Sequence, residues 1–280
     1  MKSLRHVLVL LSLVGLLLAG CGDDDTTSSD AAPSSTDAPE TTTSTAPADP
    51  LTILVTNDDG IGAPGIDALV SALSDLDDVE LVVVAPAENQ SGSSDKTTEG
   101  GATWSDGTTA GGMEGTAVDG FPADAVNVAL DDLGIEPDLV VSGVNQGQNI
   151  GPLAAISGTV GAARTAIRQG VPAVAASAGL RDETEFSAAA ALVVEWIEEN
   201  RSAIVDGSIA ADQVVSFNIP DCTAGEIGDL VEVPLGDALP DGVNVFETDC
   251  SVDRADVAPE TDVDAIVNGF ATETLVPADL

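Results

Sequence analysis

Residues 51–60 read LTILVTNDDG: a nearly continuous apolar run, then an amide, two carboxylates and a glycine. Such a run predicts a strand of a parallel sheet that is covered on both faces. Comparable runs at 81–85, 139–142 and 171–177 are separated by segments with helical periodicity. This alternation predicts an α/β fold, specifically a Rossmann-like three-layer sandwich with a mostly parallel sheet.

Two parts of the chain depart from this alternation. Residues 87–118 are rich in Gly, Ser and Thr, which predicts a long loop or a mobile hairpin. After residue 210 the apolar runs shorten and separate, which predicts an irregular C-terminal β extension. We expect residues 51–280 to form one domain, since a chain of that length can bury a sizeable core.

The charge and the histidine content exclude several classes of function. The formal net charge is −40, and such a field repels nucleic acids and anionic membrane surfaces, so no nucleic acid partner is expected. The only histidine is His6. It falls in the predicted leader, so the remaining chain has no Ser-His-Asp triad, no Cys-His pair and no His-ligated zinc. Carboxylates, amides, hydroxyls and the backbone must carry any chemistry.

The first twenty residues are typical of a signal peptide. Lys2 and Arg5 precede an apolar run at 7–18 that is too short to span a membrane comfortably. The run ends in Leu-Ala-Gly-Cys21, which resembles a bacterial lipoprotein cleavage box and implies a lipid on Cys21. The alternative is an ordinary leader in which this cysteine is incidental.

Residues 21–50 support the lipoprotein interpretation. They consist mostly of Asp, Thr, Ser, Ala and Pro, which predicts a disordered acidic tether. We therefore expect an extracytoplasmic protein that is anchored to the cell membrane and contacts it through the lipid only.

Exported proteins meet oxidising conditions, so we hypothesise that Cys222 and Cys250 form a disulfide. The alternative is two buried free thiols.

Three predicted strands end in polar loops, at 57–60, 89–92 and 145–149. The carboxyl ends of parallel strands meet at one edge of a sheet, so these loops should converge. Asp58 and Asp59 suit a hard divalent cation, although Asp59 could instead support the turn or cap the next helix. The hydroxyl of Ser91 and the amide of Asn145 could complete an oxygen-only site without adding charge.

Two further features of these loops have competing explanations. Ser157-Gly158-Thr159 precedes a predicted helix and could bind a phosphate, or could simply cap that helix. Residues 60–65 read GIGAPG, which matches the dinucleotide-binding pattern G-x-G-x-x-G. However, Asp58 and Asp59 would face the pyrophosphate, and Pro64 removes a backbone donor. The glycines are better explained by a sharp turn next to a metal.

Several motifs together resemble those of the SurE (survival protein E) family of 5′/3′-nucleotidases. In chain order they are VTNDDGI at 55–61 with APGI at 63–66, AP at 85–86 with NQSG at 89–92, VSGVN at 141–145 with Gly147 and Asn149, SGTV at 157–160, FNIP at 217–220 and TDV at 261–263. They extend over nearly all of the predicted domain. Motifs in a fixed order are a far stronger signal than any one of them.

The resemblance implies a function and a set of site residues. One divalent cation, Mg²⁺ or Mn²⁺, would be held by Asp58, Asp59, Ser91 and Asn145. Asn149 and the Ser157-Gly158-Thr159 turn would lie against the phosphate. The expected reaction is hydrolysis of nucleoside 5′(3′)-monophosphates by a metal-activated water, with Asp58 or Asp59 as proton acceptor. The resemblance also implies homodimers or homotetramers. The alternative is a non-catalytic surface lipoprotein that binds a nucleotide or another small ligand.

Overall fold

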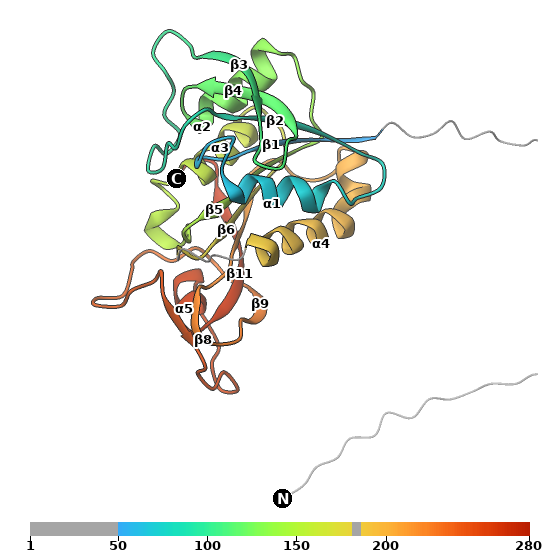
Figure 1. The fold of residues 1–280 in the computed structure, drawn as a ribbon. Coiled ribbons are helices and arrows are strands. Elements are labelled where there is room, and N and C mark those ends of the chain that lie inside the picture. Colours follow the sequence, from blue (N-terminus) through green and yellow to red (C-terminus); the bar gives the residue numbers. More distant parts are fainter. Residues whose placement is uncertain (1–49, 181–185) are drawn as a thin grey trace, which may run out of the picture. The chain divides into compact units, whose positions relative to one another are not determined.

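A nine-stranded sheet forms the centre of the structure, a computed structural model that describes residues 50–180 and 186–280 (Figure 1). The strand order is β3-β4-β2-β1-β5-β6-β7-β11-β9. The bounds are β1 Leu51–Thr56, β2 Val79–Pro86, β3 Thr103–Thr108, β4 Glu114–Asp119, β5 Leu139–Gln146, β6 Ala173–Ala178, β7 Gln213–Asn218, β9 Gly228–Glu232 and β11 Phe270–Pro277. The predicted leader, the lipidation site Cys21 and residues 21–49 of the predicted tether lie outside the described residues.

The sheet is mostly parallel, as the sequence predicts. Parallel pairing runs without interruption from β4 through β2, β1, β5 and β6 to β7. The antiparallel pairs among the described strands of this sheet are β3–β4 and β7–β11, and β9 pairs parallel with β11. Among the described residues, no helix is long and apolar enough to cross a membrane.

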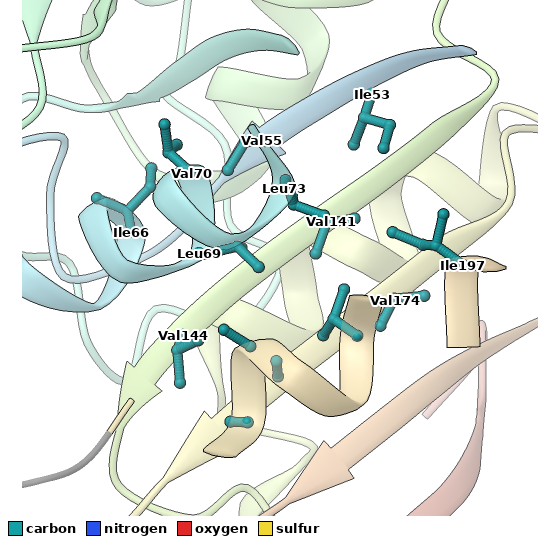
Figure 2. Packing of buried hydrophobic residues seen from close by; sticks show 14 of the residues in the cluster. Ile53, Val55, Ile66, Leu69, Val70, Leu73, Val141, Val144, Val174 and Ile197 are labelled. Carbon is teal, nitrogen blue, oxygen red and sulfur yellow. The ribbon is translucent and has the colours of Figure 1, made fainter. Parts of the chain in front are cut away.

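Helices cover both faces of the sheet. One layer holds α1 (Pro64–Leu73) and α4 (Phe186–Val205), and Figure 2 shows α1 side chains directed at the sheet. The other layer holds α3 (Gly158–Arg168) and α2 (Pro122–Asn127), which continues as a π-helical turn η1 (Val128–Asp132). Successive side chains of a strand point to opposite faces, so Ile53 and Val55 pack under α1 whereas Leu54 packs under the other layer. The predicted three-layer sandwich is confirmed.

The order of the strands places a crevice at the ends of β1 and β5. The chain leaves β1 through α1 to β2 on one side, while β5 lies on the other side of β1. The chain segments that follow β1 and β5 therefore lead away from each other at the ends of these strands. Thr56 and Ser142 are the last paired residues of β1 and β5. Open α/β sheets bind their ligands beyond the carboxyl ends of such strands.

The two irregular segments are more ordered than the sequence predicts. Residues 103–119 form an antiparallel hairpin of β3 and β4, and β4 extends the sheet by pairing with β2. The expectation that all strands shorten after residue 210 is wrong for β11, which has eight residues. Buried Thr272 and Thr274 interrupt its apolar pattern, so the pattern alone does not predict a core strand here.

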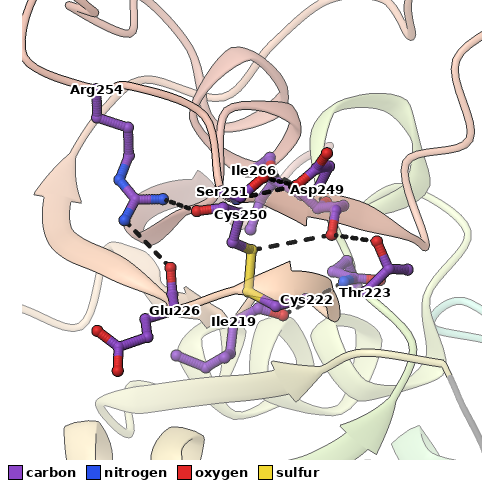
Figure 3. The surroundings of a disulfide bond; sticks show 11 residues. Ile219, Cys222, Thr223, Glu226, Asp249, Cys250, Ser251, Arg254 and Ile266 are labelled. Atoms are coloured by element: carbon purple, nitrogen blue, oxygen red, sulfur yellow. Dashed lines mark hydrogen bonds between the residues drawn. A yellow bond between two sulfur atoms is a disulfide. The ribbon is translucent and has the colours of Figure 1, made fainter.

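The C-terminal extension carries a small core of its own and a disulfide. Two short parallel strands, β8 (Cys222–Gly225) and β10 (Thr248–Cys250), are joined by the Cys222–Cys250 bond, with 5.3 Å between the Cα atoms (Figure 3). This is the pairing hypothesised from the sequence. Helix α5 (Asp262–Val267) packs beside them around Ile150, Val245, Val263 and Ile266.

We predict that the disulfide stabilises the extension. Its closed loop has a sequence separation of 28 residues, for which chain entropy gives about 3.6 kcal/mol of stabilisation. The Cys222→Ala/Cys250→Ala double variant should therefore unfold at lower urea concentration than the wild type. Reductant should lower the wild-type midpoint and leave that of the double variant unchanged. Equal midpoints for oxidised wild type and double variant would contradict the prediction.

Candidate functional site

The turn after β1 is closed by Asn57. Its side-chain amide donates to the carbonyl of Gly60 (2.9 Å), and its amide oxygen accepts from the N–H of Gly60 (3.2 Å). Gly60 has a φ of 103°, a conformation that favours glycine. Asn57 is buried, and it was not among the predicted site residues. The pattern Asn-x-x-Gly, which is typical of such turns, could have revealed its role.

Asp59 connects all three polar loops. One carboxylate oxygen accepts from the side chain of Asn89 (2.9 Å), and the other accepts from the backbone N–H of Gln146 (3.1 Å). The N–H of Gln90 also donates to the carbonyl of Asp58 (2.7 Å). The loops after β1, β2 and β5 therefore meet at one point, as the sequence predicts. Asn89 is a second supporting residue that the prediction did not single out.

Asp58 lies under the N-terminus of α3. Its carboxylate accepts a hydrogen bond from the hydroxyl of Thr159 (2.6 Å), and its residue is only 2% exposed. A Cβ at position 158 would lie 2.7 Å from the Cβ of Asp58, so the close approach requires Gly158. Ser157 caps the helix by accepting from the N–H of Val160 (3.1 Å). The capping explanation of the Ser157-Gly158-Thr159 motif is therefore confirmed. The same turn also contacts Asp58, and phosphate binding by this turn stays a prediction.

The two carboxylates carry negative charge that no basic residue offsets. Burial raises the pKa of Asp58 to about 6, the charge of Asp59 adds to this rise, and the Thr159 hydroxyl opposes it. Burial also raises the pKa of Asp59. Within the described ranges, the Lys and Arg ion pairs both involve Asp95, and neither reaches the site. Three hydrogen bonds stabilise the ionised pair in part, and a bound cation would stabilise it further.

Asn145 and Ser91 supply uncharged oxygens. The amide nitrogen of Asn145 donates to the carbonyl of Gly147 (2.7 Å), and its oxygen accepts no hydrogen bond from the described residues. Ser91 is exposed, and its N–H donates to Asn89 (3.0 Å) while its hydroxyl contacts no described polar group at hydrogen-bond distance. The described residues contain no cluster of three or more His, Cys, Asp or Glu side chains suited to a metal. Two carboxylates, an amide and a hydroxyl are nevertheless a suitable oxygen set for Mg²⁺ or Mn²⁺.

Two other features border the carboxylates. Asn149 lies on the far side of Thr159, with 3.5 Å between its amide nitrogen and the Thr159 hydroxyl. A cleft of about 440 Å³ opens beside Asp59, lined by the 60–65 turn, residues 87–89, Gln146 and Phe186. The volume suits a small organic ligand.

The G-x-G-x-x-G match at 60–65 has local structural causes. Gly60 supplies the left-handed turn described above. A Cβ at Gly65 would lie 1.9 Å from the carbonyl oxygen of Val144, so this glycine lets α1 pack against β5. Pro64 occupies the first turn of α1. These roles explain Gly60 and Gly65 without a dinucleotide, whereas a Cβ at Gly62 would meet nothing within 4 Å.

Comparison with known proteins agrees with the geometry. The family model described as Survival protein SurE matches residues 53–237. The chain belongs to the SurE family. It is 35% identical to the 5′-nucleotidase SurE of Methylococcus capsulatus over 81% of this chain and 92% of that protein. It is 33% identical to the 5′-nucleotidase SurE of Nitrosococcus oceani, over 82% and 92% respectively.

A solved SurE structure shares the fold. The crystal structure of the SurE protein from Aquifex aeolicus superposes with a TM-score of 0.64 at 28% identity, covering 82% of this chain and 94% of that chain. The α/β architecture predicted from the sequence is therefore that of a SurE protein.

We predict that Asp58 lowers the stability of the metal-free protein. A raised folded-state pKa means that its stabilising contribution is present below the ordinary carboxyl pKa and is lost as pH rises through about 6. In chelator, Asp58→Asn should therefore raise the free energy of unfolding by about 2–3 kcal/mol at pH 8, and by little near pH 4. Urea denaturation at both pH values measures this. A variant less stable than the wild type at pH 8 would refute it.

Proposed function

We propose that this SurE protein is a divalent-metal-dependent phosphomonoesterase that converts nucleoside 5′(3′)-monophosphates to nucleoside and phosphate. The observation that carries the proposal is the pair Asp58 and Asp59, which lies at the meeting point of three loops with no basic partner among the described residues. Family membership supports the same activity, since the two relatives named above are 5′-nucleotidases.

The residues present suit a divalent cation. Asp58, Asp59, Asn145 and Ser91 would hold it through oxygen atoms, as hard cations prefer. When bound, the cation would supply positive charge for the phosphate and lower the pKa of a water molecule. With no histidine after position 6, no residue of the domain has an ordinary pKa near neutrality.

The chain's own groups would bind and orient the substrate. The N-terminus of α3 presents backbone N–H groups at Gly158 and Thr159, a favourable place for a phosphate. Asn149 would donate from the other side of Thr159. The nucleoside would occupy the cleft beside Asp59, where Phe186 offers an aromatic ring.

Hydrolysis requires one proton acceptor and one leaving group. The oxygen of water forms a bond to phosphorus while the bond from phosphorus to the ribose oxygen breaks. Asp58 or Asp59 would hold the proton that the water gives up, and the nucleoside oxygen would take up a proton from solvent as it leaves. Thr159 keeps Asp58 in place for this role through its 2.6 Å hydrogen bond.

The proposal extends to location and assembly. A leader at 1–20 that is followed directly by Cys21, and a polar segment at 21–50, support an extracytoplasmic protein anchored by its lipid. Homodimers or homotetramers are proposed on family membership alone.

We predict that activity depends on both carboxylates and on added metal. Asp58→Asn and Asp59→Asn should each lower kcat for AMP by about a hundredfold or more, the usual effect of losing a key electrostatic group. The wild type should be inactive in EDTA and recover with Mn²⁺ or Mg²⁺. Phosphate release from AMP and from an aryl phosphate provides the measurement.

A matched control is Asp138→Asn. Asp138 accepts from the N–H of Thr52 (2.8 Å) near the beginning of β1, at the opposite end of this strand from Asp58. An asparagine at position 138 retains that acceptor. This variant should keep wild-type kcat. Full activity in EDTA, or in folded Asp58→Asn, would refute the mechanism, and nucleotide binding without turnover would favour the non-catalytic alternative.

We predict that Cys21→Ser abolishes the lipid anchor. The sulfur atom of Cys21 would carry the lipid, and a serine at this position offers no sulfur for the attachment. Mass spectrometry of the N-terminal peptide, together with fractionation of membranes, checks this. A lipid-modified N-terminus in the variant would disprove the assignment.

A further inference from the structure

Ser177 and Asn218 are polar side chains at 0% exposure, at the ends of two core strands. Ser177 is the penultimate residue of β6, Asn218 is the last residue of β7, and the two are direct register partners. Burying such groups costs stability unless each finds a hydrogen-bond partner. Both side chains find a partner in Asn149, a residue of the loop after β5, and the side-chain nitrogen of Asn218 also donates to the hydroxyl of Ser216 (3.4 Å).

Asn149 is held at two points. Its backbone N–H donates to the amide oxygen of Asn218 (2.7 Å), and its side-chain nitrogen donates to the hydroxyl of Ser177 (2.9 Å). The adjoining backbone strengthens the attachment, since the N–H of Ile219 donates to the carbonyl of Ser177 (3.0 Å). One contact fixes where the backbone of Asn149 lies, and the other fixes how its amide group is turned.

The orientation determines what the amide can still bind. With one N–H directed at Ser177, the second N–H faces the Thr159 hydroxyl across a long 3.5 Å contact. Such a contact is weak and can be exchanged for a stronger acceptor. Thr159 in turn donates to Asp58, so this second N–H points to the turn where the phosphate is proposed to lie.

We propose that Ser177 and Asn218 are positioning residues, which aim Asn149 at the phosphate group of the substrate. The inference rests on the proposed function and deepens it. It concerns the anion-binding side of the site, because neither residue contacts Asp58, Asp59, Ser91 or Asn145 through a hydrogen bond among the described residues.

The protein contains a matched control for this role. Ser142 in β5 is also a serine at 0% exposure, in a strand adjacent to β6, but its hydroxyl has no hydrogen-bond partner in the part of the chain that the structure describes. Replacing it by alanine removes the same atom from the same kind of environment without affecting Asn149.

The test uses inorganic phosphate as a competitive inhibitor of AMP hydrolysis, with Mn²⁺ present. The inhibition constant does not depend on the fraction of active enzyme, so partial unfolding alone would not change it. Ser177→Ala and Asn218→Leu should each raise this constant and the KM for AMP by about tenfold, since a misplaced donor loses its hydrogen bond. Ser142→Ala should match the wild type. Thermal unfolding shows whether each variant is folded.

The outcomes separate the inference from the function on which it rests. Unchanged phosphate inhibition in both folded variants, with an active wild type, would overturn the positioning role alone. The same result for Ser177→Ala is decisive if Asn218→Leu fails to fold. Equal weakening in Ser142→Ala would also overturn it, because any buried serine would then suffice. A wild type that hydrolyses no AMP would overturn the proposed function and this inference with it.

Discussion

The site depends on two adjacent carboxylates that are held together without a positive partner among the described residues. Asp58 is buried at the carboxyl end of β1, next to Asp59, and its pKa rises to about 6 as a result. The free energy of folding therefore includes the cost of desolvating the Asp58 carboxylate and the cost of its repulsion by Asp59. The surrounding contacts do so in part: Thr159, Asn89 and the backbone of Gln146 each donate to one of the two carboxylates.

Those donors come from separate parts of the chain, and the sheet topology brings them together. The crevice at the ends of β1 and β5 receives the loops after β1, β2 and β5, while α3 approaches from the adjacent layer. The approach of α3 is close enough to require Gly158 beside Asp58. Gly158, which the sequence placed in a predicted phosphate motif, is thus required by the packing of α3 against Asp58.

Much of this arrangement could be predicted from the sequence, because its signals are local. Apolar runs and polar loop ends indicated β1, β2, β5 and β6, and the parallel order followed from the alternation with helices. The hairpin β3–β4 was one of two alternatives that the sequence left open. The strand β11 could not be predicted, because its stability comes from neighbours distant in sequence. β11 carries buried Thr272 and Thr274, so its pattern does not show that β7 and β9 flank it.

The same limit explains which residues of the site were missed. Asp58, Asp59 and Asn145 stand in recognisable loops, whereas Ser177 and Asn218 stand at the ends of apolar strands that look structurally ordinary. Their importance appears only when Asn149, distant in sequence from both, is seen between them. A buried polar residue at the carboxyl end of a parallel strand is costly as a core residue, yet it lies where such sheets bind ligands. In this protein two such residues in register hold one loop asparagine, so the strand ends themselves set the geometry of the site.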